Sequence, residues 1–322
     1  MDDEMTTHSP ELITFGETMA LFMAPDYKGL DQVSGVEQSF GGAESNLAIG
    51  AARLGASVGW FGALGEDPFG TRILKAVRGE GVDVSRARRV AGEQTGLMFR
   101  DNPGGKLSVH YYRKHSAASR MQPSDLDEAY IQGSRILHVT GITCAISETA
   151  RETLIAAVRI AKAAGVKVSF DPNLRLKLWS IEEARRVLLP IAAEADYFLP
   201  GWDELALLYD TDDEQAIFAA VSELNAVSVI KGYGEKTLVL ENGSRTEVPF
   251  YKADKVIDTV GAGDGFCAGF LTGLLQGKST VDAVRIGSIC GSLAVQGRGD
   301  WESLPDRGAV ERLLEDRKWI ER

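Results

Sequence analysis

The sequence predicts an α/β fold in which helices flank a doubly wound, mostly parallel sheet, with a small antiparallel sheet beside it. Short β-rich runs alternate with helix-periodic segments along most of the 322 residues, as expected when crossover helices join parallel strands. Two segments, residues 18–42 and 94–116, break this alternation and carry turn signals instead. We expect one domain over residues 1–322, with the small sheet formed by insertions at about 17–41 and 93–116.

The first part of the chain supplies two strand–helix pairs. The run ELITFGE, residues 11–17, predicts a strand, and residues 43–54 predict a helix with one apolar face. Residues 57–65 predict the next strand, and a second helix is expected over residues 67–79. Such alternation is the repeating unit of a parallel sheet.

Buried central strands are predicted in the middle of the chain. Four compact apolar runs are typical of such strands: residues 135–141, 166–173, 197–200 and 227–232. Amphipathic helices are predicted at residues 147–165 and 180–195, with Ser147 and Ser180 as their N-caps.

A strand-to-helix passage is predicted near the C-terminal end of this pattern. Residues 254–257 predict the end of a strand. A helix is expected from Gly265 onward, because apolar residues recur there at every fourth position. The small residues Gly261, Ala262 and Gly263 would form the turn between the two.

The two irregular segments predict the small antiparallel sheet. In the second segment NPGG, residues 102–105, separates LMFRD from KLSVHYYR as a hairpin turn would. A sheet built from two insertions beside the main body makes a natural lid. Its exposed strands can also pair with a second copy, so we expect a homo-oligomer formed through the lid.

Composition excludes several classes of protein. The net charge of −11 disfavours a nucleic-acid partner, and no apolar run approaches the roughly 18 to 20 residues that span a bilayer. The polar, acidic start MDDEMTTHSPE lacks the features of a signal peptide, so a cytoplasmic location is expected. Cys144, Cys267 and Cys290 are far apart and are expected to be reduced, buried thiols.

The segment around Asp264 predicts chemistry on an anion. Small residues at 261–263 leave backbone N–H groups free, and the dipole of the following helix favours negative charge at the same place. A second carboxylate beside a bound anion is repelled by several kcal/mol at about 4 Å, so Asp264 is better interpreted as a reacting group. It could accept a proton from a hydroxyl that attacks the γ-phosphoryl group of ATP. The alternative is an ordinary acid in the first turn of a helix.

Two common nucleotide motifs do not fit this segment. In GAGDGF, Phe266 stands where the dinucleotide motif G-x-G-x-x-G needs its third glycine, and the turn is far from the start of the chain. The sequence contains no G-x-x-x-x-G-K-[ST], which excludes a P-loop on motif grounds.

Two long motifs resemble one family. DTVGAGDGFCAGF, residues 258–270, is similar to the C-terminal signature of the ribokinase-like (PfkB) carbohydrate kinases. FGGAESNLAIGAARLGASVGWFGALGEDPFG, residues 40–70, is similar to their N-terminal glycine-rich signature, and the resemblance covers about residues 11–308. It implies an α/β sandwich with a β-sheet lid and in-line transfer from ATP. It also implies Asp264 as the base and Gly261, Ala262 and Gly263 as the anion hole.

The motif GGAESN is expected on the sugar side. Gly41 and Gly42 allow close approach of the backbone, and Asn46 offers both a donor and an acceptor to a hydroxyl. The resemblance implies that this motif contacts the sugar. For the two glycines, tight packing at a helix start is the alternative.

Arginines near the same site predict an acidic substrate. With strand alternation, Tyr111 and Arg113 share one face while Tyr112 points to the other. An aromatic ring and a guanidinium facing one pocket suit a carboxylate. Asn173 and Arg175, which follow a predicted strand, could add a second positive group, although surface exposure is the commonest fate of arginine.

GGAESN, YYR and DPNLR together resemble the 2-keto-3-deoxygluconate kinase branch of the family. The resemblance implies that Gly42, Tyr111, Arg113, Arg175 and Asp264 line the substrate site. Met98 departs from the branch, where a tyrosine often follows TGL. A thioether cannot donate the hydrogen bond of a phenol, so one sugar contact differs.

The nucleotide side follows from the resemblance alone. Glu204 matches the glutamate that organises magnesium through water, although Gly201 replaces the asparagine of that motif, and the alternative is a residue that only begins a helix. Lys231, Gly232 and Gly234 lie in a strand–turn–strand segment near the expected ATP, which Gly263 would also contact.

Two further expectations complete the nucleotide side. Ser288 falls where many relatives have an asparagine beside the adenine. A potassium or sodium site around Asp258 and Val260 is known among relatives, but nothing else in the sequence requires it.

The sequence therefore predicts an ATP- and magnesium-dependent kinase acting on the terminal, C6 hydroxyl of 2-keto-3-deoxygluconate. A fructokinase or another kinase of neutral ketoses or ribose is the alternative, favoured if Met98 marks a reshaped pocket. A catalytically silent sugar-binding regulator is a second alternative, which the intact Asp264 and its loop disfavour.

Overall fold

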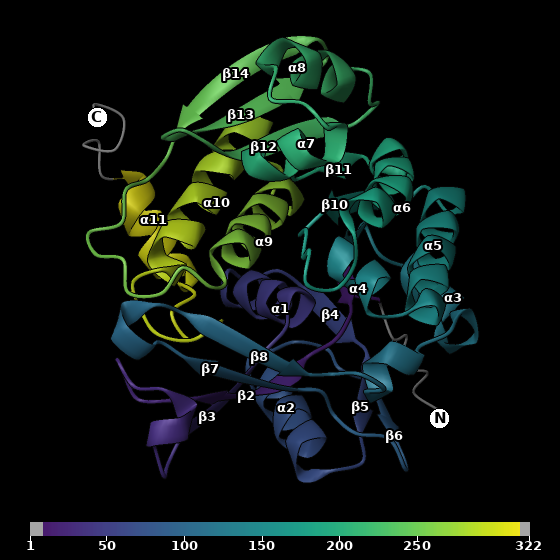
Figure 1. Cartoon of the computed structure of the whole chain (residues 1–322). Coiled ribbons are helices and arrows are strands. Elements are labelled where there is room, and N and C mark those ends of the chain that lie inside the picture. Colours follow the sequence, from purple (N-terminus) through teal and green to yellow (C-terminus); the bar gives the residue numbers. More distant parts are fainter. Residues whose placement is uncertain (1–8, 316–322) are drawn as a thin grey trace.

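A computed structural model describes residues 9–315, and its main element is an eight-stranded sheet (Figure 1). The strand order is β14-β13-β12-β11-β10-β9-β1-β4, with parallel pairing from β4 to β12 and antiparallel pairing from β12 to β14. The strands are β1 (Leu12–Phe15), β4 (Val58–Phe61), β9 (Ile136–Thr140), β10 (Lys167–Asp171), β11 (Tyr197–Phe198), β12 (Val227–Tyr233), β13 (Lys236–Glu241) and β14 (Ser244–Pro249). The expected mostly parallel sheet is confirmed.

Helices cover both faces of this sheet, as a doubly wound fold requires. Neighbouring residues of β1 point to opposite faces: Leu12 packs in the apolar cluster that contains α1, α2, α9 and α10, and Ile13 packs in the cluster that contains α5 to α8. The helices of the first group and α11 are α1 (Ala43–Arg53), α2 (Pro68–Gly79), α9 (Ala262–Leu275), α10 (Thr280–Ala294) and α11 (Arg307–Glu315). The others are α3 (Glu128–Gln132), α4 (Gly141–Ile146), α5 (Glu148–Ala163), α6 (Ile181–Glu194), α7 (Trp202–Tyr209) and α8 (Glu214–Ser222).

Helix starts follow the predicted capping. The side chains of Ser147 and Ser180 accept hydrogen bonds from the backbone N–H groups of Ala150 and Glu183, at 3.0 and 3.2 Å. Both serines are therefore N-caps, of α5 and α6 respectively. Short 3₁₀ turns occupy connections at Leu30–Gln32, Pro103–Gly105, Ala117–Arg120 and Pro123–Asp125.

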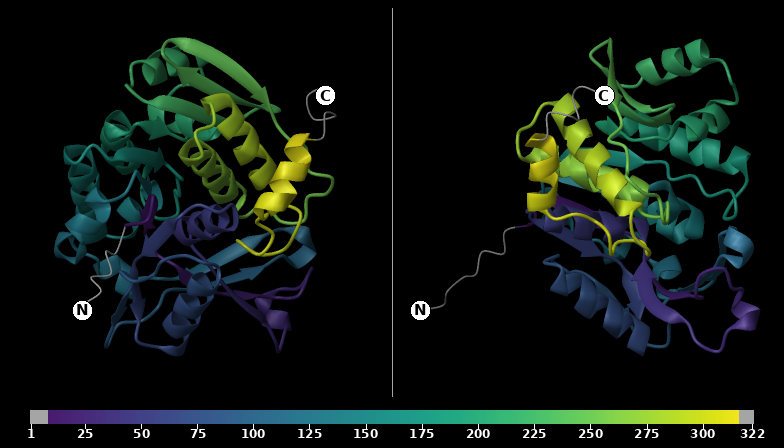
Figure 2. Two further views of the ribbon diagram at one scale, coloured as in Figure 1. Left: turned by 180° about the vertical axis from the view of Figure 1, so that it is seen from behind. Right: turned by 90° about the vertical axis from the view of Figure 1, so that its left-hand side faces the viewer.

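The second sheet has four strands in the order β3-β2-β7-β8, and all lie within the two predicted insertions. They are β2 (Met19–Met23), β3 (Glu37–Gly41), β7 (Leu97–Asp101) and β8 (Ser108–Tyr112). Each insertion forms an antiparallel pair, as expected of a small antiparallel sheet, and β2 and β7 join the two pairs in parallel at the centre. Figures 1 and 2 place this sheet at the end of the molecule opposite β13 and β14.

Two strand predictions need correction. The strand expected over residues 57–65 is divided at Gly62 into β4 and β5 (Ala63–Gly65), and β5 pairs with β6 (Arg88–Val90). A Cβ atom at Gly62 would lie 2.4 Å from the carbonyl oxygen of Gly16, so the backbones approach closely where the strand breaks.

No strand forms at residues 254–257. The hairpin of β13 and β14 already completes this edge of the sheet, and the chain crosses from Pro249 to α9 as an irregular connection. The backbone N–H groups of Ile257 and Asp258 bond to the carbonyl oxygen of Val295 rather than to a neighbouring strand. The following helix begins at Ala262, one turn before the predicted Gly265.

Two expectations from composition concern the described residues. Cys144, Cys267 and Cys290 are buried and free, as expected. Among residues 9–315, none of the helices has both the length and the apolar character needed to cross a membrane.

Candidate active site

A cavity of about 640 Å³ lies between the main sheet and the four-stranded sheet. Strands β10 and β12 contribute residues from one side, and β2, β7 and β8 contribute residues from the other. Most of the predicted site residues line it: Gly41, Gly42, Asn46, Met98, Tyr111, Arg113, Asn173, Arg175, Glu204, Lys231, Gly261, Gly263 and Asp264.

Asp264 lies in the first turn of α9 and faces α1, which packs against that helix. The side-chain amide of Asn46, on α1, donates a hydrogen bond of 2.8 Å to Asp264 Oδ2. Burial raises the pKa of the Asp264 carboxyl to about 6, with the hydrogen bond from Asn46 acting in the opposite direction. A carboxylate with a pKa close to neutral is suited to accept a proton from a substrate hydroxyl.

The turn before Asp264 requires glycine at one position. Gly261 has a φ of 79°, in the left-handed region, and a Cβ atom there would lie 2.0 Å from the carbonyl oxygen of Asp300. At Gly263 a Cβ atom would meet only Lys231 Nζ, at 3.9 Å, so the cavity side of this position is open. The first N–H groups of a helix have no partner within the helix, which leaves them free for an anion.

We therefore expect Gly261→Ala to destabilise the fold by roughly 1–3 kcal/mol, because alanine would adopt a strained φ and contact the backbone of Asp300. Gly263→Ala is the matched control and should change the free energy of unfolding by about 0.5 kcal/mol or less. Thermal unfolding midpoints of both variants measure the difference. Equal midpoints would show that the geometry of Gly261 is not required.

Lys231 faces the cavity in a buried ion pair that the sequence did not predict. Its Nζ lies 2.7 Å from Asp171 Oδ2, at the end of β10. Burial disfavours the ammonium, but the negative charge of Asp171 outweighs burial and holds the pKa of Lys231 above its usual range. Burial likewise disfavours the charged form of Asp171, but Lys231 outweighs it and the pKa of Asp171 is lowered. Lys231 therefore stays protonated beside Gly263, as the cationic half of an ion pair with Asp171.

Asn173 carries two signs of a binding position. Its φ of 39° is in the left-handed region, and its side-chain oxygen is buried without a hydrogen-bond partner among residues 9–315. Strained backbone and unpaired buried polar atoms are concentrated at functional sites. Asn173 is thus available to a ligand or to ordered water in this cavity.

Glu204 serves its own helix as well as the cavity. Its two carboxylate oxygens accept hydrogen bonds from the backbone N–H groups of Leu174 and Gly201, at 2.6 and 2.7 Å, the second of which caps α7. Burial, and next the charge of Asp171, raise the pKa of Glu204. In the described part of the chain no three His, Cys, Asp or Glu side chains are grouped to hold a metal. Glu204 and the unpaired oxygen of Asn173 fit a magnesium ion that keeps its water shell.

Tyr111 and Arg113 lie on one face, as predicted, with the guanidinium 5.7 Å from the ring centroid. Tyr112 packs on the other face against Phe99. Arg113 Nη2 lies 2.5 Å from the carboxylate of Glu17, whose side chain is 1% exposed. Glu17 therefore neutralises much of the charge of Arg113 before any substrate binds, and sequence reasoning missed this pair because the partners are 96 residues apart.

Arg175 is exposed at the mouth of the cavity, in the loop after β10. Its guanidinium contacts the carbonyl oxygen of Leu174 at 3.3 Å and has no acidic partner among residues 9–315. The charge of Arg175 nevertheless lowers the pKa of Asp264, so it acts close to the buried acid. Of the two predicted arginines, Arg175 is the one whose charge is available to an anion.

Met98 forms part of an apolar floor. It is buried with Met19, Leu21 and Met23 in a small apolar cluster formed by strands β2 and β7 of the four-stranded sheet. A Cβ atom at Gly41 would lie 2.8 Å from Met98 Cε and 2.1 Å from Asp300 Oδ2, so Gly41 makes room for both side chains.

Four predicted residues do not line this cavity. Ala262 lies inside the first turn of α9. Gly232 lies near the end of β12 and Gly234 in the turn between β12 and β13, with φ values of 74° and 59°. Ser288, on α10, accepts a hydrogen bond of 2.7 Å from the backbone N–H of Tyr251 and so anchors the connection after β14. Their roles toward a nucleotide stay predictions.

Comparison with known proteins gives consistent matches over nearly the whole chain. The pfkB family carbohydrate kinase profile matches residues 9–307. A 2-dehydro-3-deoxygluconokinase of Bacillus subtilis (strain 168) is 38% identical, over 96% of this chain and 97% of the relative, and a probable fructokinase-7 of Arabidopsis thaliana is 32% identical over 94% and 92%. Among solved structures, a PfkB protein from Polaromonas sp. JS666 superposes with a TM-score of 0.86 at 36% identity, over 95% of this chain and 100% of the other.

Proposed function

Because this chain belongs to the pfkB family of carbohydrate kinases, we propose that it transfers the γ-phosphoryl group of ATP to the terminal, C6 hydroxyl of 2-keto-3-deoxygluconate. The observation that carries the proposal is the position of Asp264, a buried acid held by Asn46 at the start of α9 beside the turn at Gly261.

In this mechanism Asp264 accepts the proton of the substrate hydroxyl. The hydroxyl oxygen attacks the γ-phosphorus of ATP, and ADP leaves. The N–H groups at the start of α9 and the ammonium of Lys231 stabilise negative charge on the phosphoryl oxygens. Asn46 orients the acid through its hydrogen bond. Magnesium, when bound, would neutralise further charge on the phosphates, with Glu204 and Asn173 holding its waters.

Arg175 supports an acidic sugar as the substrate. A guanidinium without an acidic partner at the mouth of the cavity is suited to bind a carboxylate through two hydrogen bonds. The B. subtilis relative is named as a kinase of the same compound, 2-dehydro-3-deoxygluconate. Arg113 and Tyr111 would contact the sugar from the four-stranded sheet.

A neutral ketose such as fructose is the second candidate. Met98 offers only an apolar contact, and Glu17 already pairs with Arg113, so the cavity is less cationic than its two arginines imply. The relative from A. thaliana is named a probable fructokinase.

The four-stranded sheet is proposed to act as a lid and as an oligomer contact. Closure over the sugar would exclude water and limit hydrolysis of ATP. β3 and β8 are its edges, and Tyr27, Leu107 and Tyr112 are exposed on its strands and connections. Light scattering on the purified protein should give a mass of at least two chains of 34.8 kDa. The mass of a single chain would reject the oligomer.

An ADP-release assay tests the proposed activity. The substrates to compare are 2-keto-3-deoxygluconate, its galactonate epimer, fructose, ribose and adenosine. We expect the largest kcat/KM for 2-keto-3-deoxygluconate. A larger value for fructose would favour the second candidate, and no sugar-dependent ADP release would favour a binding protein without catalysis.

The pH dependence follows from the raised pKa of Asp264. The base must be deprotonated to act, so kcat/KM should be constant above about pH 6 and fall roughly tenfold per unit below it. Initial rates between pH 4.5 and 8 at low substrate concentration measure how kcat/KM falls on the acidic side. This fall reports the pKa of the base in the free enzyme. A plateau that continues to about pH 4.5 would mean that no group with this pKa is required.

A further inference from the structure

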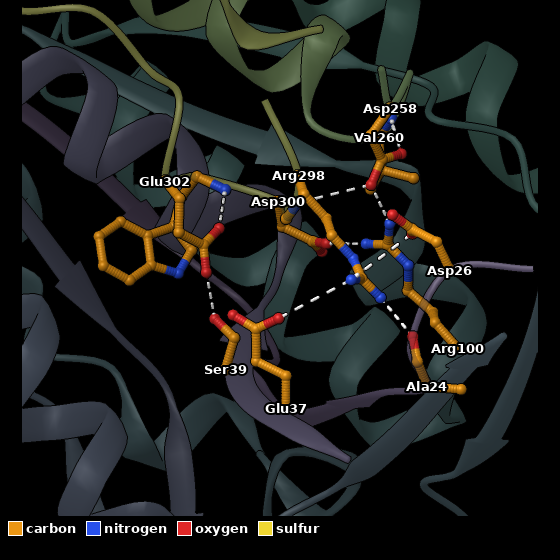
Figure 3. A network of polar contacts seen from close by, with 12 residues as sticks. Ala24, Asp26, Glu37, Ser39, Arg100, Asp258, Val260, Arg298, Asp300 and Glu302 are labelled. Carbon is orange, nitrogen blue, oxygen red and sulfur yellow. Dashed lines mark hydrogen bonds and ion pairs between the residues drawn. The ribbon is translucent and has the colours of Figure 1, made fainter. Parts of the chain in front are cut away.

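Arg100, on strand β7 of the four-stranded sheet, is bonded to two buried carboxylates that sequence analysis did not connect with it. Its Nη2 bonds to Asp258 and its Nη1 bonds to Asp300 (Figure 3). The side chains of all three residues are less than 10% exposed. The pairing spans 158 and 200 residues of sequence, so it joins parts of the chain that only the fold brings together.

Both acids hold the turn that precedes the base. Asp258 accepts a hydrogen bond of 3.1 Å from the backbone N–H of Val260, directly before Gly261. The carbonyl oxygen of Asp300 lies against Gly261 from the other side, where a Cβ atom would be 2.0 Å away. The guanidinium of Arg100 therefore supports the Gly261 turn from two sides, through Asp258 and through Asp300.

Arg298 extends the link to the first insertion. It bonds to the carbonyl oxygen of Ala24, and its Nη1 lies 3.5 Å from Asp26 and 4.0 Å from Glu37 (Figure 3). These partners are on or beside β2 and β3, and the two acids are more than 60% exposed. Within residues 9–315, the cation that pairs with Asp258 and Asp300 is Arg100 and not Arg298.

The family resemblance raised the possibility of a potassium or sodium site around Asp258 and Val260, although nothing else in the sequence required one. The residues do not fit that ion, because the carboxylate of Asp258 already bonds to a guanidinium that carries the same single positive charge. A second cation beside Asp258 would be repelled by Arg100 inside a poorly solvated site. Burial raises the pKa of Asp300 to about 7, and Arg100 acts against this shift, as a resident cation would.

We propose that Arg100 is a positioning residue that supplies the fixed cation behind the Gly261 turn, so that phosphoryl transfer by this chain needs no monovalent metal ion. The proposal rests on the proposed kinase activity for its rate readout. Because Arg100 belongs to the four-stranded sheet, the charge that orders the Gly261 turn comes from the element that contacts the sugar.

The first test is the rate of ADP release in potassium, sodium or choline chloride at equal ionic strength. Wild-type kcat should differ by less than about twofold among the three salts. Arg100→Met should lower kcat roughly 10- to 100-fold, more than it raises the KM for the sugar, since it disturbs the turn rather than the sugar contacts. Potassium or guanidinium chloride should raise the kcat of Arg100→Met several-fold. Arg100→Lys should retain more activity than Arg100→Met.

A second readout does not depend on turnover. The thermal midpoint of the wild-type protein should be equal in potassium and choline chloride, whereas that of Arg100→Met should be higher in potassium. Arg298→Met removes a neighbouring guanidinium but keeps Arg100, so its midpoint should be equal in both salts. If no sugar is phosphorylated, the proposed function fails. These midpoints still test whether Arg100 takes the place of a monovalent metal ion.

Wild-type stimulation by potassium of about fivefold or more, or a potassium-specific rise of the wild-type midpoint, would overturn the proposal. Normal kcat in Arg100→Met without any response to cations would also overturn it. If Arg100→Met does not fold, the two wild-type measurements decide the question by themselves.

Discussion

Asp264→Asn should lower kcat by roughly 10²- to 10⁴-fold while ATP still binds with near-normal affinity. The amide has the same shape as the acid but cannot accept the proton of the attacking hydroxyl. The variant should fold at least as well as the wild type, because burial disfavours the charged carboxylate and raises its pKa to about 6. Steady-state ADP release and calorimetric titration with ATP separate the two effects.

The control for this variant is another acid in the first turn of a helix. Asp282 lies in the first turn of α10, outside the cavity. Its backbone N–H donates a hydrogen bond of 3.1 Å to the side chain of Ser279, the N-cap of this helix, and its carboxylate accepts one of 2.7 Å from the Ser279 hydroxyl. Asp282→Asn should leave kcat unchanged and cost about 1 kcal/mol or less of stability. If Asp264→Asn behaved in the same way, with near-normal turnover, Asp264 would be an ordinary helix-start acid and not the base.

Arg175→Ala is expected to have the second largest effect, and the effect should depend on the substrate. For 2-keto-3-deoxygluconate kcat/KM should fall about 10- to 100-fold, because a charge-assisted hydrogen bond contributes roughly 1.5–3 kcal/mol. For fructose, which has no carboxylate, the fall should be less than about threefold. The two kcat/KM values, measured on the same enzyme preparation, give the difference directly.

Arg185 provides the matched control. It bonds to the carbonyl oxygen of Leu207 and to Asp210, away from the cavity lining, so Arg185→Ala should change neither substrate's kcat/KM by more than about twofold. Equal losses on both substrates in Arg175→Ala would contradict the assignment of Arg175 to the carboxylate. Arg113→Ala is a less specific test, because it would leave Glu17 buried without its cation.

Much of the fold could be predicted from local signals. Apolar runs identified the central strands, and serine caps marked the starts of α5 and α6. The strand end predicted at residues 254–257 was wrong. The apolar pair Val256 and Ile257 resembled the end of a strand, but both side chains are more than 50% exposed in an irregular connection. The parallel pairing of β2 with β7 depends on how two distant insertions meet, which no local pattern reveals.

The candidate site was predicted where a residue type itself indicates chemistry, as at Asp264 and in the small residues before it. Its ion pairs were not predicted. Lys231 with Asp171, Arg113 with Glu17, and Arg100 with Asp258 and Asp300 join residues 60 to 200 positions apart. Sequence spacing does not say which buried acid meets which cation. The sole signal was that Asp171 lies near the C-terminal end of a predicted central strand, where ligands of parallel sheets commonly bind.

The most direct measurement is the identity of the product formed from ATP and 2-keto-3-deoxygluconate. Mass spectrometry and ³¹P NMR of the reaction should show ADP and 2-keto-3-deoxygluconate 6-phosphate in equal amounts, with the phosphate on the terminal carbon. Absence of this sugar phosphate under conditions in which fructose is phosphorylated would contradict the proposed substrate. Absence of any sugar phosphate would contradict the assignment of Asp264 as a catalytic base.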